Sequence, residues 1–206
     1  MNRVKFEEKD HTYYDDADKE YVSVSRILEY FGISQIDKLK AIHGEEHFAA
    51  LALFGKEVHK LTAAEDRHEL NKWKYDKRLD PYIEGWCSFR HQVNLNKGFL
   101  AIEDPLLSKV WGFAGTPDRI VDRGTFLEIP DLKCGCETVA EKIQTALYAI
   151  LAEENYGKPV KARYTVHLDP KKALGYQVIP HNNKNDINVA KSLMVVWNYK
   201  KEKGLL

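Results

Sequence analysis

The chain has 206 residues, which is enough for one ordinary domain and short for two. Hydrophobic residues make up 44% of it and charged residues 30%, so the composition excludes a disordered chain, a collagen and a coiled coil. The formal net charge is zero, and the molecule as a whole therefore has no field that attracts a polyanion or a membrane. Residues 157–206 nevertheless carry ten basic and three acidic side chains, which either hold a nucleic acid locally or form a solvated lysine-rich surface.

Two further properties bear on location and cofactors. The longest apolar run, residues 48–54, is too short to cross a bilayer, and the first ten residues carry no apolar signal region. The cysteines Cys87, Cys134 and Cys136 are odd in number and lack C-x-x-C spacing, so we expect no disulfide framework and no four-cysteine zinc or iron–sulfur cluster. We expect no nucleotide cofactor, because the sequence has no phosphate-binding glycine loop. A reducing cytoplasm fits these features.

The first half of the chain is predicted to be a short hairpin followed by helices. Two β-prone runs flank the acidic residues 15–18, which are typical of a turn. Ser23 is a suitable N-cap for the first helix, and Gly55 is expected to interrupt the second. Bases and aromatics interleave over residues 71–78, where Trp73 either stacks on a nucleic acid or packs in the core. The expected elements are strands over 11–14 and 20–22 and helices over 24–31, 44–64 and 81–96.

After Gly98 the hydrophobic pattern changes from helical to alternating. The expected strands cover residues 99–103, 110–113, 116–121, 126–133, 164–168 and 176–179, and the expected helices cover 138–155 and 187–200. This order predicts an α/β fold with a mixed sheet that helices cover on both sides. We expect a single domain over 1–206, with a helical part over about 23–96, a core over about 98–180 and a last helix over about 187–200.

The most informative residues are two acids and a lysine on one predicted hairpin. Asp118 lies near the start of one strand and Asp131 near the end of its partner, so the two carboxylates can converge on one point. Lys133 shares a face with Asp131 because side chains alternate along a strand, whereas Leu132 points into the core. The acids suit a hard divalent cation, and the lysine suits the negative charge that develops during phosphodiester cleavage.

The order and spacing of these residues resemble a known nuclease signature. Thr116-Pro117-Asp118 followed by Asp131-Leu132-Lys133 is similar to the motif of the PD-(D/E)XK nuclease superfamily, in its RecB-like and phage exonuclease branch. The resemblance covers residues 11–148 and implies a restriction-endonuclease-like fold. It also includes four further features, which are Gly112 to Asp118, Gln144-x-x-x-Tyr148, Gly55-x-x-x-His59, and His11-x-Tyr13 with Tyr21-Val-Ser-Val-Ser25.

The resemblance implies a divalent-metal-dependent nuclease whose catalytic residues are Asp118, Asp131 and Lys133. It implies that Mg²⁺ or Mn²⁺ is bound by Asp118, by Asp131 and by the backbone carbonyl of Leu132. The family usually has an aliphatic residue at the position of Pro130, which lacks an N–H group, so the local metal geometry is open. The same proline decides whether Glu128 faces away from Asp131.

Four residues outside the hairpin receive roles from the resemblance. It implies that His59 helps to bind the metal and that Glu103 is a weaker ligand, acting through water. It directs Gln144 and Tyr148, which are four positions apart on one helix, towards the substrate strand. Without it, His59 is a helix histidine satisfied by a neighbour, Glu103 is a surface glutamate, and Tyr148 is a core aromatic beside a solvent-facing Gln144.

The leading functional hypothesis is a DNA exonuclease that acts on linear, double-stranded ends in recombination, repair or phage replication. The expected location is the cytoplasm of a bacterium or of a phage-infected cell. One alternative is a non-catalytic DNA-end-binding module on the same fold, and another is a structure-selective or nicking endonuclease. A homo-oligomer and a single-strand-annealing partner both remain open, and no membrane partner is expected.

Overall fold

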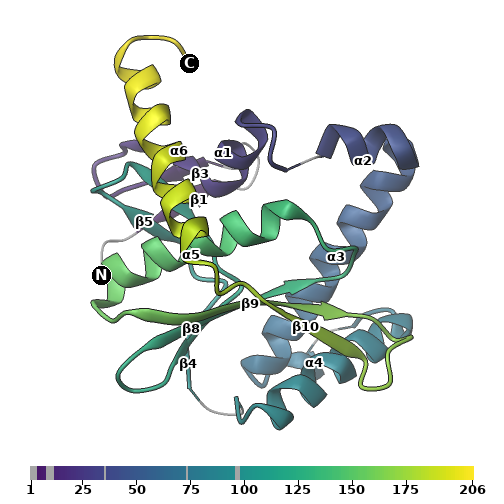
Figure 1. Ribbon diagram of the computed structural model, residues 1–206. Coiled ribbons are helices and arrows are strands. Elements are labelled where there is room, and N and C mark those ends of the chain that lie inside the picture. The colour runs from purple at the N-terminus through teal and green to yellow at the C-terminus, as the bar shows by residue number, and fades with distance from the viewer. Residues whose placement is uncertain (1–3, 8–11, 35, 73, 96–97) are drawn as a thin grey trace.

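Figure 1 shows the computed structural model of the chain, which describes residues 4–7, 12–34, 36–72, 74–95 and 98–206. Over these residues the protein forms two five-stranded sheets, six α-helices and two short 3-10 helices. The α-helices are α1 (Val24–Tyr30), α2 (Ile36–His43), α3 (Glu45–Asp66), α4 (Asp80–Gln92), α5 (Val139–Tyr156) and α6 (Lys184–Glu202), and the 3-10 helices span Leu70–Lys72 and Lys77–Leu79.

The amino-terminal sheet has the strand order β1-β2-β3-β6-β5. Its predicted hairpin is confirmed, because β2 and β3 pair antiparallel, although His11 lies outside the described residues. Strand β3 then pairs parallel with β6, which joins this hairpin to a later part of the chain. The strands are β1 (Lys5–Glu7), β2 (Thr12–Tyr14), β3 (Glu20–Ser23), β5 (Leu106–Ser108) and β6 (Phe113–Gly115).

The central sheet has the strand order β10-β9-β8-β7-β4 and is mixed. Strands β8 and β9 pair parallel, with α5 as the crossover between them, and the other neighbours pair antiparallel. The strands are β4 (Phe99–Ile102), β7 (Arg119–Asp122), β8 (Leu127–Lys133), β9 (Val160–Leu168) and β10 (Tyr176–Pro180). The predicted hairpin of two strands followed by a crossover helix is therefore present as β7, β8 and α5.

Helices cover both faces of the central sheet, as the sequence pattern predicts (Figure 1). Helices α5, α1 and α6 share one buried cluster with Ile129 of β8, and α3 and α4 share another with Leu132. This alternation follows from the two-residue period of the strand. Among the described helices, none has both the length and the apolar character needed to cross a membrane.

Helix α5 begins and ends where local sequence signals predict. The Thr138 side chain and Glu141 form a capping box at its start, which satisfies backbone N–H groups that the helix leaves unpaired. Gly157 ends it in the left-handed conformation, with φ at 66°. Ser23 likewise caps α1, because its hydroxyl oxygen accepts from the backbone N–H of Arg26 at 3.1 Å.

The elements differ from the prediction at several places. Gly55 does not interrupt α3, because one glycine costs a helix only about 1 kcal/mol and the flanking turns are intact. The strand predicted over 110–113 is mostly a turn with an exposed Val110, because β6 begins only at Phe113. Helix α2 was not predicted. The last helix begins at Lys184 rather than at about 187, because Asn183 caps it.

The contact between α4 and the β9–β10 turn leads to a stability prediction. A Cβ atom on Gly85 would lie 2.5 Å from the Gly175 carbonyl oxygen, so the two backbones touch. Gly85→Ala is expected to lower the free energy of unfolding by about 1–3 kcal/mol, because the backbone has to move apart. Urea unfolding measures this change. The control is Gly55→Ala, where no atom lies within 4 Å of the added Cβ, and an equal response of the two variants would contradict the contact.

Candidate active site

The predicted acids and lysine meet at one end of the central sheet. Asp118 lies directly before β7, and Asp131 and Lys133 lie near the end of β8. The backbone N–H of Leu132 donates to Asp118 Oδ2 at 2.6 Å, so the first acid is tied to the strand that carries the second. The Lys133 ammonium contacts Asp131 Oδ2 directly. The structure therefore brings these three side chains together.

Helix α3 and the end of β4 add a histidine and a third acid to this group. His59 Nδ1 lies 3.2 Å from Asp118 Oδ1. The backbone N–H of Glu103 donates to the Asp118 carbonyl at 2.9 Å, which holds the two acids side by side. One potential ligand atom from each of these three residues lies within 4.8 Å of the others. The strand predicted over 99–103 included Glu103. In the structure β4 ends at Ile102, and Glu103 follows it with φ at 52°.

Unsatisfied carboxylate oxygens indicate that the group suits a cation. Asp131 is 1% exposed, and its Oδ1 has no hydrogen-bond partner among the described residues, as is also true of Glu103 Oε1. Buried polar atoms without hydrogen-bond partners are rare and costly, and a cation would satisfy the Asp131 oxygen. Glu103 Oε1 also lies 3.7 Å from Arg119 Nη1, and the group whose ligand atoms lie within 4.8 Å of one another contains His59, Glu103 and Asp118 but not Asp131. The available ligands are carboxylate oxygens with one imidazole, which suit Mg²⁺ or Mn²⁺ better than a soft metal. The residues present therefore fit a hard divalent metal ion.

The pKa values of Asp131 and Glu103 are raised, whereas the pKa of Asp118 is lowered. Burial raises the pKa of Asp131 to about 6, and the neighbouring Asp118 charge adds to this although Lys133 opposes it. Burial also favours neutral Asp118, but the charges of His59 and Lys133 outweigh it and lower its pKa below the ordinary range. Burial and the Asp118 charge raise the pKa of Glu103. A cation at this point would relieve the repulsion among these acids.

Lys133 remains an ammonium group in this environment. Burial would lower its pKa, but Asp131 and Asp118 outweigh this effect and raise it. The lysine is therefore protonated at neutral pH and acts as a fixed positive charge rather than as a base. Its side chain keeps 24% exposure, so a phosphate can approach it.

Gln144 and Tyr148 both lie beside this group. The Gln144 amide nitrogen donates to the Tyr148 hydroxyl oxygen at 3.1 Å on one face of α5. Burial and the charges of Asp131 and Asp118 raise the Tyr148 pKa well above its ordinary value. The phenol therefore stays neutral. Among the described residues, no acceptor is found for the hydrogen of the Tyr148 hydroxyl. This hydroxyl can therefore donate a hydrogen bond to a substrate oxygen.

Three residues on or next to β8, namely Pro130, Glu128 and Cys134, have clear environments. Pro130 keeps the register between β8 and β9, because the only irregularity in that pairing lies between Leu127 and Glu128. Glu128 accordingly faces away from Asp131 and forms an ion pair with Arg123 at 3.2 Å. Burial raises the pKa of the Cys134 thiol to about 12, so it is not a nucleophile at neutral pH.

A buried polar network that the sequence did not predict supports this group of acids and His59 from behind. The Asp66 carboxylate, on the last turn of α3, accepts from Arg119 Nε at 2.5 Å, Arg90 Nη1 at 2.6 Å and Trp86 Nε1 at 2.9 Å. Arg119 also donates to the Asp118 carbonyl at 2.7 Å and to the Thr62 hydroxyl at 3.3 Å. Because Thr62 in turn donates to the His59 carbonyl at 2.9 Å, the network ties α3 to β7 behind two candidate ligands.

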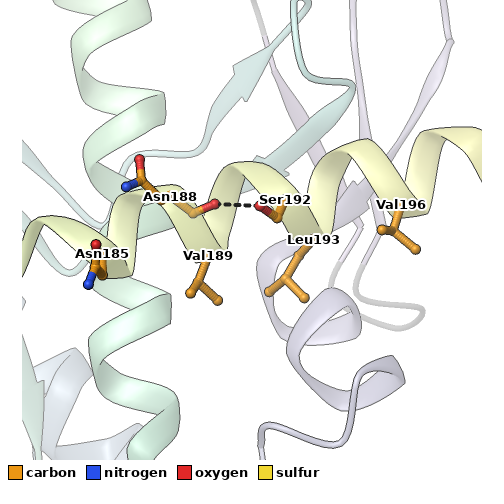
Figure 2. Close-up of a pocket in the computed structure, with 6 residues that line it drawn as sticks. All are labelled: Asn185, Asn188, Val189, Ser192, Leu193 and Val196. Carbon is orange, nitrogen blue, oxygen red and sulfur yellow. Dashed lines mark hydrogen bonds between the residues drawn. The ribbon is translucent and has the colours of Figure 1, made fainter.

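One hollow, of about 470 Å³, is lined by residues of α6 and by none of the acids. Figure 2 shows that its labelled lining residues all come from this one helix, with Ser192 bonded to the Asn188 carbonyl. None of them is charged, so the chemistry described above is absent there. The lining residues are Asn185, Asn188, Val189, Ser192, Leu193 and Val196.

The basic and aromatic run over residues 71–78 lies before α4. Trp73 lies outside the described residues. The Tyr75 hydroxyl donates to Asp80 at 2.8 Å, and the Lys77 ammonium lies 4.3 Å from the centroid of its ring. Tyr75 and Lys77 are therefore engaged with their own neighbours.

The raised pKa of Asp131 leads to a prediction about metal binding and pH. A metal that uses this carboxylate has to displace its proton below about pH 6, so the apparent affinity should fall by up to about tenfold per pH unit there. The increase in melting temperature produced by Ca²⁺ should accordingly be larger at pH 7.5 than at pH 5. An equal increase at both values would count against Asp131 as a ligand.

The same shift predicts how the metal-free protein responds to pH. The folded state binds the Asp131 proton more tightly than the unfolded state, whose carboxyl has a pKa of about 4. This residue's contribution to stability is therefore greatest below about pH 4 and is lost as the pH rises through 6. Glu128→Gln, on the opposite face of β8, is the matched control and should leave this dependence unchanged.

Comparisons with known proteins give a family for the chain and a similar fold. A sequence model described as the PD-(D/E)XK nuclease superfamily matches residues 41–194, which is more than half of the chain. The structure is similar to one from Eubacterium rectale, named as a candidate exonuclease, with a TM-score of 0.57 and 12% identity over 93% of this chain and 84% of that one. It is also similar to SSO0001, with a TM-score of 0.44 and 14% identity over 85% and 75% of the two chains.

At 12% identity, the likeness to the Eubacterium rectale structure is one of fold. No sequence among the curated proteins matches the chain. The family match, by contrast, spans the acids, the lysine and the crossover helix that follows them. The chain therefore belongs to the PD-(D/E)XK nuclease superfamily, whose members are phosphodiester hydrolases that use divalent metals.

Proposed function

We propose that this protein is a metal-dependent deoxyribonuclease that degrades linear DNA from its ends. The observation that carries the proposal is the meeting of Asp118, Asp131 and Lys133 on adjacent strands, with a buried carboxylate oxygen left without a partner. Exonuclease is also the activity given in the name of the similar Eubacterium rectale protein. The proposed pathways are recombination, repair or phage replication in the cytoplasm.

The residues divide into two roles. Asp118, Asp131, His59, the Leu132 carbonyl and, through water, Glu103 would hold Mg²⁺ or Mn²⁺. When bound, such an ion polarises a phosphate oxygen and lowers the pKa of a water molecule.

The remaining side chains act on the substrate itself. Lys133 supplies a fixed positive charge for the phosphate as its negative charge grows. The Tyr148 hydroxyl, held by Gln144, donates a hydrogen bond to the strand and fixes its orientation. Gly55 lies one turn before His59 and has open space beside it, so a phosphate backbone can approach the helix closely there.

The basic test uses linear duplex DNA with Mg²⁺ or Mn²⁺, and the same reaction with excess EDTA. We expect stepwise loss of the linear substrate with either metal and no loss in EDTA. Full activity in EDTA would overturn the proposed metal dependence. A variant with Asp118→Asn should be inactive with both metals, because a neutral amide is a poorer ligand than a carboxylate.

A covalently closed circle separates the alternatives. An exonuclease leaves this substrate intact, whereas a nicking or structure-selective endonuclease opens it. Binding to linear ends with no cleavage under either metal would instead favour a non-catalytic DNA-end-binding module. Size-exclusion chromatography with light scattering tests whether the protein acts as a homo-oligomer, and the same measurement with a single-strand-annealing protein tests for that partner.

A further inference from the structure

A second hollow, of about 390 Å³, opens directly beside the acids. Glu103 belongs both to its lining and to the group that suits a metal, and Tyr148 belongs both to its lining and to the Gln144 pair. Thr116, two residues before Asp118, also lines it. The hollow is therefore continuous with the proposed reaction site, and its volume is in the range of small-ligand pockets.

Two aromatic residues of the amino-terminal sheet, Phe6 and Tyr13, form part of the lining. Phe6 of β1 and Tyr13 of β2 face each other across the strand pair, with ring centroids 4.7 Å apart and a 33° angle between the rings. Tyr13 is buried, whereas Phe6 keeps 38% of its surface exposed. Val24 and Pro105 complete the apolar part of the lining. An exposed aromatic ring supported by another is a suitable platform for a planar ligand.

The polar groups of the hollow are mostly hydroxyls. The Tyr13 hydroxyl and the Thr116 hydroxyl lie 2.9 Å apart and share one hydrogen bond, and the exposed Ser25 belongs to the lining as well. Hydroxyl groups both donate and accept hydrogen bonds, so they can pair with the edge of any nucleobase. A fixed pattern of donors and acceptors, which would select one base, is not present in this lining.

The hollow is part of the packing of the fold. A Cβ atom on Gly115 would lie 2.8 Å from Val24 Cγ2 and 3.0 Å from Tyr148 Cε1, so only glycine lets β6, α1 and α5 meet there. The side chains of Val24 and Tyr148 are consequently fixed by close contacts. The pocket therefore exists before any ligand binds, which reduces the entropy lost on binding.

We propose that this pocket receives one unpaired nucleobase of the DNA strand whose phosphate lies at the acids. The proposal rests on the proposed function, because it takes DNA as the substrate. Base stacking on aromatic side chains tolerates every base, in agreement with an apolar wall and versatile hydroxyls. A base in this pocket cannot be paired, so the strand at the reaction site is single, either from the start or after the end of a duplex opens.

A single abasic nucleotide within an otherwise normal oligonucleotide tests the proposal. The wild-type protein is followed with Mg²⁺ in single turnovers, and the rate is measured at each successive bond. We expect one pause of about tenfold where the missing base should enter the pocket, since stacking on one aromatic residue has an effect of this size. The rate at all other bonds serves as the internal reference.

Phe6→Ala should make the protein insensitive to the missing base. Without the exposed ring, we expect cleavage of normal DNA to slow about tenfold at every bond, chiefly through a higher KM, and the pause at the abasic nucleotide to disappear. Phe6→Trp keeps an aromatic surface and should keep the pause. Tyr13→Phe removes only the hydroxyl group and should also keep the pause at the abasic nucleotide. This variant therefore separates stacking from hydrogen bonding.

The outcomes distinguish this proposal from the proposed function. If normal DNA is degraded and the abasic nucleotide causes no pause, the pocket does not bind a base, although the nuclease assignment stands. A pause that persists undiminished in Phe6→Ala also overturns the proposal. If normal DNA is not degraded with Mg²⁺ or Mn²⁺, the proposed function itself fails.

Discussion

Lys133→Met is expected to lower the rate of DNA hydrolysis by about a hundredfold to a thousandfold, with little change in DNA affinity. The lysine is the protonated group that contacts Asp131 and remains open to a phosphate. Removing one preorganised charge from a reaction site typically has an effect of this size on turnover. Single-turnover cleavage measures the rate, and fluorescence anisotropy with labelled DNA in EDTA measures the affinity.

The variant is not expected to unfold, because the acid beside the lysine can become neutral. The Asp131 pKa is already about 6, and it rises further once the neighbouring positive charge is lost. Circular dichroism checks that the fold is kept. Lys142→Met is the matched control, since its ammonium lies on α5 in an exposed pair with Glu137 at 3.9 Å. Equal activity of the Lys133 variant and this control would contradict the proposed role.

Asp66→Ala is expected to have the largest effect on stability, a loss of about 3–5 kcal/mol. The carboxylate accepts from two buried guanidinium groups and an indole, and its side chain is not exposed to solvent. Its removal leaves Arg119 buried without its main counterion, and a buried charge without a partner costs this much. Urea unfolding followed by tryptophan fluorescence measures the change.

The neighbouring Glu65 provides the control for this experiment. Its side chain is 29% exposed and pairs with Arg90 at 3.4 Å, so Glu65→Ala should cost less than about 1 kcal/mol. The Asp66 variant should also bind Ca²⁺ more weakly, because Arg119 no longer holds α3 against β7 behind His59 and Asp118. A stability loss that is no greater in the Asp66 variant than in the control would show that the buried network is unimportant.

The part of the site that could be predicted from sequence depends on short-range rules. Asp118, Asp131 and Lys133 follow from strand alternation and one tight hairpin, and their meeting requires only that neighbouring strands pair. Helix caps are equally local, which is why the start of α5 at Thr138 and its end at Gly157 were predicted within one residue. The α/β class follows from the order of these local elements.

The features that the sequence did not predict depend on contacts between distant residues. Asp66 and Arg119 are 53 positions apart, and neither sits in a pattern that distinguishes a buried ion pair from a surface charge. The amino-terminal sheet was incomplete in the prediction because β5 and β6 have three residues each, too few for alternation to be visible. The pocket of Phe6 and Tyr148 joins segments that only the folded chain brings together.

The parallel pairing of β8 with β9 has a consequence for how the chain assembles. The two acid-bearing strands are joined by the few residues between Asp122 and Leu127, so their ends meet with little loss of chain entropy. The other neighbour of β8 is reached only after the whole of α5, and this longer closure raises the contact order of the fold. Asp118, Asp131 and Lys133 thus come together through contacts that are local in sequence, whereas the pairing of β9 beside them needs the longer chain closure and is expected to be the slower step.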